Sequence, residues 1–587
     1  MTTPLPPRRV STNPQPETRG MNFFDADRAL QSLLSLYLPA AERDHLTPQF
    51  HKLGALVGDQ LDDLAGTADR NPPVLHVRDR QGHDADRVEK HPAYVEMERF
   101  AFGEFEMSAM SHRPALGWPE PIHHVAKYTL QYLFAQSEFG LLCPMSMTDS
   151  LTRTLIRYAD QSLLDRYLPA LLAEDFESAA QGAMFMTEQD AGSDVGETVT
   201  TAVPDGDAWR LFGDKWFCSN ADADVVLVLA RPEGGGEGTR GLGLFLMPRL
   251  LPNGSPNRYR IVRLKDKLGT RSMASGEITL EGASAWLVGD LGRGFVQIAE
   301  MVNQSRLSNA VRAAGMMRRS LHEALCVSRN RMAFGSNLID LPLMQRQLLK
   351  LLLPTEQALS LCLFTAVALR RADEGDETGM KMRRILTPLL KFRVCRDARK
   401  VTGDAMEVRG GCGYIEEWIE ARLVRDSHLG SIWEGTSNIT ALDVLRAAKR
   451  EEAHVWLRKE LSANLAAAHG IPEGFRAELS RLLDRAVDLV ARTAAAGKSG
   501  ERSARQAASA LYHAASAVVM AVEGAALAEE KGDAGRLLMA KLVVEQKLTA
   551  SDPFIEIDAD TETADAEWLL SDTPVPLGDV ATRLEKR

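Results

Sequence analysis

AWRLFGDKWFCS, at residues 208–219, is the stretch that decides the fold, because it interrupts a chain whose apolar spacing is otherwise helical. DVVLVLAR (224–231), LGLFLMP (242–248), YRIVRL (259–264) and GEITLEG (276–282) follow it. Each run alternates or clusters β-forming residues and is bounded by Gly, Pro, Asn or Asp, which is the pattern of short strands. The sequence therefore predicts an all-β domain over residues 184–285.

Helical spacing lies on both sides of this domain. It covers most of residues 92–183, and it returns after Gly294 in stretches long enough for the helices of a bundle. Residues 1–21 are Pro-rich and predict an extended arm, and residues 71–91 predict a loop. The fold class predicted is α+β, mainly α. Its four parts are an N-terminal extension with a helical domain (1–183), a β domain (184–285), a helical bundle (286–450), and a helical extension ending in an acidic, partly disordered tail (451–587).

The composition is that of an ordinary globular protein. Of the 587 residues, 45% are apolar and 25% charged, and the formal net charge of −11 gives no general attraction to phosphate polymers. The six cysteines form no CxxC pair, so neither a metal site nor a disulfide framework is expected, and reduced thiols favour a cytoplasmic location. The N-terminus lacks the apolar core of a signal peptide, and no membrane span is expected.

Two glycine-containing segments are candidates for cofactor contacts. MTEQDAGSD (186–194) lies where helix gives way to sheet, and its hydroxyls and free amides can bind a flavin ring or a phosphate. The alternative is an ordinary polar connection. RGGCGY (409–414) permits close approach of a ligand to the backbone, or else simply ends a helix.

SIWEGTSN (431–438) contains the candidate base. Glu434 stands between Trp433 and Gly435, so an apolar neighbour shields the carboxylate and a glycine lets a ligand approach. The residues after it are good helix N-caps or phosphate contacts. The alternative is that Glu434 only caps the following helix, ITALDVLRAAKR.

Taken in order, these motifs resemble those of the acyl-CoA dehydrogenase superfamily. MTEQDAGSD is similar to the family's flavin-contacting loop, GDKWFCSNA to its GxKxWITN-like strand, RNRMAFG to RxxFG, MEVRGGCGY to QxxGGxGY and IWEGTSNI to the segment that carries the base. TNPQPETRGMNFF, NPPVLHVRDRQG and LCPMSMTDS are similar to the AidB-like branch. The resemblance implies that the β domain is a barrel and the bundle has four helices.

The resemblance also implies a role for each matching residue. Glu434 would be the base, since the other position from which relatives draw a base holds Ser305 here, and Arg306 would contact substrate. The remaining residues would contact FAD. They are Met186, Thr187, Ser193, Phe217, Ser219, Thr436 and Asn438 in one subunit, and Arg331, Phe334, Glu407, Gly410 and Gly411 reaching the FAD of a neighbour. Glu407 departs from the family's Gln, Phe217 from its Trp and Ser219 from its Thr.

The implied activity is α,β-dehydrogenation of an acyl-CoA thioester, with an electron-transferring flavoprotein as acceptor and a homotetramer as the assembly. A second hypothesis is a DNA-associated flavoprotein of the AidB kind with weak dehydrogenase activity. It would need a basic surface, yet residues 452–587 hold 16 Lys and Arg against 22 Asp and Glu. A basic cluster near the end of the bundle comprises Arg446, Lys449, Arg450, Arg458 and Lys459. A flavin monooxygenase or nitroalkane oxidase is the third hypothesis, and a glutamate at position 434 argues against it.

Overall fold

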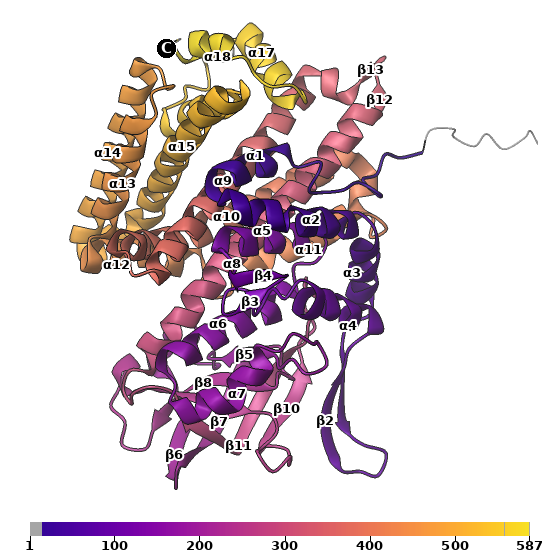
Figure 1. Ribbon diagram of the computed structural model, residues 1–587, viewed down its shortest axis with the longest axis vertical. Helices are drawn as coiled ribbons and strands as arrows, with labels where there is room; N and C mark the ends of the chain where they lie inside the picture. Colours follow the sequence, from indigo (N-terminus) through magenta and orange to yellow (C-terminus); the bar gives the residue numbers. More distant parts are fainter. Residues whose placement is uncertain (1–13, 557, 586–587) are drawn as a thin grey trace, which may run out of the picture.

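The computed structural model describes residues 14–556 and 558–585. Figure 1 shows the β domain at one end of an elongated molecule, the N-terminal helices across its middle, and the long bundle helices running to the other end. The fold is mainly helical α+β, as predicted. Of the predicted N-terminal arm, residues 1–13 lie outside the described residues, and Thr18 in the remainder donates to Glu323 of the bundle at 2.5 Å.

The N-terminal domain is helical except for short hairpins. One of these, β1–β2, corrects the prediction of a loop over residues 71–91: its strands pair antiparallel, and Arg260 of the β domain donates to Asp86 of β2. Its highly charged sequence concealed the alternation of a strand. The elements are α1 (Arg28–Tyr37), α2 (Ala40–Val57), α3 (Gln60–Arg70), β1 (Val74–Arg78), β2 (Asp84–Glu89), α4 (Pro92–Glu98), the π-helical η1 (Arg99–Glu104), β3 (Pro114–Ala115), β4 (Trp118–Pro121), α5 (His124–Phe134), α6 (Leu142–Tyr158) and α7 (Gln161–Leu171).

The middle domain closes on itself. Strand pairing runs β11–β7–β6–β8–β9 and returns to β11. In addition, β10 pairs with β11, and β5 pairs with β8. The strand β8, whose residues are mostly buried, pairs with β5, β6 and β9 and so leaves no free edge. The elements are β5 (Gly182–Phe185), η2 (Val195–Glu197), β6 (Thr201–Asp205), β7 (Ala208–Ser219), β8 (Val225–Pro232), η3 (Thr239–Gly241), β9 (Gly243–Pro248), β10 (Tyr259–Leu264) and β11 (Ser275–Leu287).

The bundle is built on three long helices, α8, α9 and α10, which pack against one another, while α12 packs on α10. Asp376 caps α10 by accepting from Thr378 and Gly379 N–H, and Pro342 begins α9. The elements are α8 (Gly294–Asn330), β12 (Met332–Ala333), β13 (Ser336–Asn337), η4 (Leu338–Asp340), α9 (Pro342–Asp373), α10 (Glu377–Arg409), η5 (Gly410–Tyr414), α11 (Ile419–Gly430) and α12 (Ser437–Glu451).

The described part of the C-terminal extension packs on the bundle. The acidic tail was predicted to be partly disordered, but its described residues form α17 and α18, where Leu570, Val580 and Leu584 are buried. The elements are α13 (Ala453–Ala467), α14 (Glu473–Ala495), η6 (Gly497–Ser503), α15 (Ala504–Lys531), α16 (Gly535–Val543), the π-helical η7 (Val544–Leu548), α17 (Ala559–Leu570) and α18 (Leu577–Glu585).

Two stretches are long and apolar enough to cross a membrane by composition. They are Pro342–Asp373 and Gly497–Lys531, and their most apolar windows are 89% and 83% buried inside the protein. Packing within the bundle and the extension accounts for this composition.

A pair of buried carboxyl groups lies where the three domains of the core meet. Asp426 of α11 accepts from Thr270 N–H at 2.6 Å, and Glu138, between α5 and α6, accepts from the Ser272 hydroxyl at 3.0 Å. Burial raises the pKa of Asp426 to about 7, and the charge of Glu138 adds to the shift. The junction therefore contains an acid that titrates near neutral pH.

Candidate functional site

The loop between α11 and α12 presents Glu434 in a fixed conformation. Glu434 is left-handed, with φ of +55°, and Gly435 follows at +98°. A Cβ on Gly435 would lie 3.1 Å from Ile439 Cγ2 and 3.2 Å from Arg306 Nη2, so only glycine fits. The sequence WEG thus serves a turn that aims the glutamate side chain back at α8.

Both carboxylate oxygens of Glu434 are held by α8. Ser305 Oγ donates to Oε1 at 2.5 Å, and Asn309 Nδ2 donates to Oε2 at 3.2 Å. These bonds replace the capping role considered as the alternative, since Thr436, and not Glu434, is the N-cap residue of α12. The two family positions for a base, 305 and 434, lie in direct contact.

Two buried cations hold the carbonyl groups of the same loop. Arg306 Nε donates to the Glu434 carbonyl at 2.8 Å while its Nη1 pairs with Asp443 at 2.7 Å. Lys391 Nζ donates to the Gly430 carbonyl at 2.5 Å and to that of Gly435 at 3.4 Å. Arg306 was predicted to contact substrate. In this structure it supports the loop by binding the Glu434 carbonyl, and it forms an ion pair with Asp443.

Four of the predicted flavin contacts come together at one edge of the β domain. Trp216 N–H donates to the Thr187 carbonyl at 2.8 Å, which joins the segment containing Met186 and Thr187 to the end of β7, where Phe217 and Ser219 lie. Phe217 is 58% exposed. Ser193 is exposed on the loop that follows Thr187.

Cys143, at the start of α6, links this edge to the loop of Glu434. Burial raises the pKa of Cys143 to about 11. The positive charge of Arg312 opposes this rise, and the negative charge of Glu434 adds to it. A hydrogen bond with Ser219 also opposes the rise. These groups surround one thiol. The structure therefore brings Ser219 and Glu434 into one region, with Thr436 and Asn438 exposed at the start of α12.

The second group of predicted contacts lies elsewhere. Arg331 follows the last residue of α8, and its Nη1 donates to the Arg409 carbonyl at 3.3 Å, next to Gly410 and Gly411. Phe334, at the tip of the β12–β13 hairpin, is 96% exposed. At 1.5 Å per helical residue, Ser305 and Arg331 are roughly 39 Å apart, and Figure 1 shows the hairpin at the end of α8 opposite the β domain. Glu407 lies on the last turn of α10.

Sequence reasoning missed three residues around Glu434: Asn309, Arg312 and Lys391. Arg312 and Asn309 are fully buried, and Lys391 is 2% exposed. A signal for the first two existed, because polar residues recur at 305, 309 and 312 on one face of a buried helix. Lys391 carried no such signal, since its partners lie 39 and 44 residues away.

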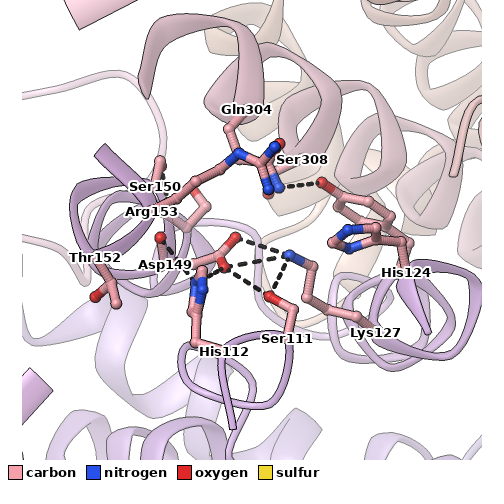
Figure 2. A network of polar contacts seen from close by, with 12 residues as sticks. Ser111, His112, His124, Lys127, Asp149, Ser150, Thr152, Arg153, Gln304 and Ser308 are labelled. Atoms are coloured by element: carbon pink, nitrogen blue, oxygen red, sulfur yellow. Dashed lines mark hydrogen bonds and ion pairs between the residues drawn. The ribbon is translucent and has the colours of Figure 1, made fainter. Parts of the chain in front are cut away.

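A polar network lies beside this site between α5, α6 and α8 (Figure 2). Lys127 Nζ donates to Asp149 at 3.0 Å and to Ser111 at 3.1 Å, and His112 contacts Asp149 at 2.9 Å. Although burial acts in the other direction, Lys127 and His112 hold the pKa of Asp149 well below its usual range. Ser308 of α8, drawn in the same view, bonds Gln131 at 2.9 Å. The network joins the N-terminal domain to α8.

Comparisons with known proteins agree with this arrangement. Residues 292–449 match the family model "Acyl-CoA dehydrogenase, C-terminal domain", residues 183–283 the middle domain, and residues 13–178 "Adaptive response protein AidB N-terminal domain". The chain is 36% identical over 444 residues to the putative acyl-CoA dehydrogenase AidB of Escherichia coli, covering 73% of this chain and 78% of AidB. It is 34% identical to acyl-CoA dehydrogenase family member 11 of Caenorhabditis elegans, covering 73% of this chain and 71% of that protein.

Solved structures give the same result. The crystal structure of C. elegans ACDH-11 in complex with C11-CoA matches with a TM-score of 0.84 at 27% identity, covering 97% of this chain and 98% of that one. Bd2924 in its apo form matches with a TM-score of 0.79 at 31% identity, covering 88% of this chain and 100% of that one. From its three matched domains and these relatives, this chain belongs to the acyl-CoA dehydrogenase family and carries an AidB-type N-terminal domain.

Proposed function

We propose that this protein is a FAD-dependent acyl-CoA dehydrogenase and that Glu434 removes the α-proton of the acyl thioester. The observation that supports this role is the pair of hydrogen bonds that hold the Glu434 carboxylate on a fixed loop, facing α8 and beside the Ser219 edge. A held carboxylate with a defined orientation meets the geometric requirement for a general base. The structure of ACDH-11 with C11-CoA supports an acyl-CoA ligand for this fold.

In the proposed reaction Glu434 accepts the α-proton, and the β-carbon loses a hydride, so a C=C bond forms as two C–H bonds break. The backbone N–H of Glu434 would donate to the thioester carbonyl and stabilise the charge that develops there. Bound FAD would supply the hydride acceptor.

The residues present fit such a cofactor. Phe217 is a large apolar side chain left 58% exposed at a strand end, beside the hydroxyls of Thr187 and Ser219. A flat, partly polar ring system would cover Phe217 and form hydrogen bonds with Thr187 and Ser219. Met186, Thr187, Phe217 and Ser219 would hold the ring, and Ser193, Thr436 and Asn438 the polar remainder.

We propose that the assembly is a homotetramer in which a neighbour completes each FAD site. Arg331, Phe334, Glu407, Gly410 and Gly411 are too far from Glu434 to reach the same ligand within one chain. Phe334 and Tyr414, 96% and 79% exposed, would be covered by that contact. We further propose a cytoplasmic location and an electron-transferring flavoprotein as the acceptor of electrons.

One observation favours a second candidate function, association with nucleic acid. Positively charged side chains of α9, α10, α15 and η7 gather on one surface. Burial lowers the pKa of Arg396, and the charges of Arg505, Arg393 and Arg399 lower it further. Burial also lowers the pKa of Lys547; the charge of Asp397 opposes this shift, and those of Arg393, Lys400 and Lys350 add to it. This cationic patch (Lys350, Arg393, Arg396, Arg399, Lys400, Arg505 and Lys547) is distinct from the cluster predicted near residue 450 and offers contacts for phosphates.

Glu434→Gln tests the proposed function. The change keeps shape and removes the proton acceptor, so reduction of bound flavin by an accepted acyl-CoA should slow about 10²- to 10⁴-fold or more. Stopped-flow absorbance on wild type, Glu434→Gln and the matched control Glu417→Gln, an exposed glutamate before α11, gives the comparison. FAD content and melting temperature should stay close to wild type in both variants. Equal reduction rates in wild type and Glu434→Gln would remove Glu434 from the mechanism.

A further inference from the structure

Arg312 is a buried cation. Its side chain is completely buried in α8, and within residues 14–556 and 558–585 no carboxylate lies within ion-pair distance of it. Neither Nη1 nor Nη2 has a hydrogen-bond partner in that part of the chain; its only protein bond is from Nε to the Ser308 carbonyl at 3.4 Å. Leaving a guanidinium buried and unpaired costs several kcal/mol or more, so a bound group is expected to satisfy it.

The guanidinium lies beside the proposed base. Its central carbon is 5.0 Å from the centre of the Phe139 ring and 5.1 Å from that of Trp433, the residue before Glu434. The bond to Ser308 shows that the side chain folds back along α8 toward Ser305 and Asn309, which hold the Glu434 carboxylate. Arg312 therefore lies on the face of α8 that holds Glu434, and its guanidinium contacts Trp433, the residue before the proposed base.

Further polar atoms around Arg312 are left open. Trp433 Nε1 and Asn309 Oδ1 are buried and have no hydrogen-bond partner among the described residues. At 100° per residue, Gln304, Ser305, Ser308, Asn309 and Arg312 occupy one continuous face of α8. A hydrocarbon chain would leave the guanidinium and the indole N–H unsatisfied, whereas a carboxylate presents two acceptor oxygens to the Arg312 fork.

We propose that Arg312 is a specificity-determining residue that binds a carboxylate at the far end of the acyl group, so that the preferred substrates are thioesters of dicarboxylic acids. This inference rests on the proposed function, because it takes the acyl group to lie beside Glu434. The aromatic rings of Phe139 and Trp433 hold the guanidinium in place, and the Trp433 N–H is a second donor to the same carboxylate.

The test compares matched thioesters that differ only in their last carbon. Pairs of equal chain length, from succinyl-CoA with butanoyl-CoA up to octanedioyl-CoA with octanoyl-CoA, are titrated calorimetrically into the FAD-loaded protein, so that binding is measured apart from turnover. At the best length, the wild type should bind the carboxyl-ended thioester about 10- to 100-fold more tightly, as a charge-assisted pair predicts. Arg312→Met should remove this preference or reverse it, and Arg312→Lys, which keeps charge without the fork, should retain part of it.

The outcomes separate this inference from the proposed function. If no thioester of either series reduces the bound flavin, the dehydrogenase function fails, while the calorimetric preference still decides the role of Arg312. If the wild type binds methyl-ended thioesters as tightly as carboxyl-ended ones at every length, Arg312 only packs against the two rings and the inference is overturned. Should Arg312→Met lose its FAD or its cooperative melting transition, the wild-type preference and Arg312→Lys decide the question.

Discussion

At the residue scale, Glu434 occupies a backbone conformation that its side chain disfavours. A left-handed non-glycine residue costs about 1–2 kcal/mol, and the surroundings offset this cost. Arg306 binds the Glu434 carbonyl, Lys391 binds the carbonyls on either side of the turn, and Gly435 allows the chain to leave it. The conformation is therefore imposed by contacts from two bundle helices and not by the loop itself.

Asp426, at the domain junction, predicts a pH-dependent stability. Its folded pKa of about 7 lies above the unfolded value of about 3.8, so the folded state binds the proton more tightly. The contribution of Asp426 to stability should therefore be greatest below about pH 4, fall as pH rises toward 7, and stay level above 7. Asp426→Asn stays neutral at every pH and keeps an acceptor for Thr270, so it should gain up to about 4 kcal/mol over the wild type between pH 4 and 8.

Melting temperatures of wild type and Asp426→Asn across this range check the prediction. Asp266→Asn, at an exposed aspartate in the β10–β11 loop that contains Thr270, is the matched control and should show a constant difference from wild type. A stability difference for Asp426→Asn that does not change with pH would show that the carboxyl group is ionised throughout.

At the element scale, periodicity and motif order predicted most of the fold, and the exceptions have physical causes. The strands β7 to β11 were visible as apolar runs between turn residues. The β1–β2 hairpin was not, because both of its faces are largely exposed and its sequence carries charge where alternation would show. The acidic composition of the tail from residue 551 predicted partial disorder, because it outweighed the few apolar residues that α17 and α18 bury.

The candidate site divides in the same way. Glu434 and the residues after it are contiguous, so a local motif predicted them. Its partner Asn309 on α8 is 125 residues away from it. Lys391 of α10 is 39 and 44 residues away from the glycines that it binds, Gly430 and Gly435. Local patterns do not record which distant side chains the fold brings to one place.

Removing α17 and α18 tests whether the tail belongs to the folded unit. A chain ending at residue 549 would lose the buried ion pairs of Arg583 with Asp565 and Glu545 and would expose the surfaces of α9 and α16 that these helices cover. The melting temperature should fall by roughly 5 °C or more, and binding of a hydrophobic dye should increase. An unchanged melting temperature would mean that the tail contributes nothing to the core.

At the scale of the whole molecule, the two groups of predicted cofactor contacts imply shared sites. The test mixes two variant proteins, Glu434→Gln and the double variant Arg331→Ala/Phe334→Ala. A pair of subunits that contains one of each would have one intact site, with Glu434 from one subunit and Arg331 and Phe334 from the other. Refolded or co-expressed at equal amounts, the two inactive variants should recover about a quarter of wild-type flavin reduction if pairing is random. Recovery no greater than the sum of the separate variants would place both groups in one chain's site.

The cationic patch leads to a separate prediction on nucleic acid. The net charge of −11 opposes association, so duplex DNA should bind more weakly than about 1 μM at physiological salt, and affinity should fall roughly 10²- to 10³-fold between 50 and 200 mM salt. Arg396→Glu/Arg399→Glu should weaken binding further, whereas Lys449→Glu/Lys459→Glu, in the other cluster, should do so less. Fluorescence anisotropy at several salt concentrations measures both. Sub-micromolar binding at physiological salt would show that the patch outweighs the net charge.

The length of α8 has a consequence for how the protein behaves on dilution. A single helix carries the Ser305 end of one proposed site and the Arg331 end of another, so subunit contact and flavin retention would be one coupled equilibrium. Reciprocity then requires that whatever factor FAD adds to the affinity between subunits, the neighbouring subunit adds to the affinity for FAD. A concentrated yellow solution should therefore lose colour to the filtrate when diluted and concentrated again, and added flavin should draw dispersed subunits back together.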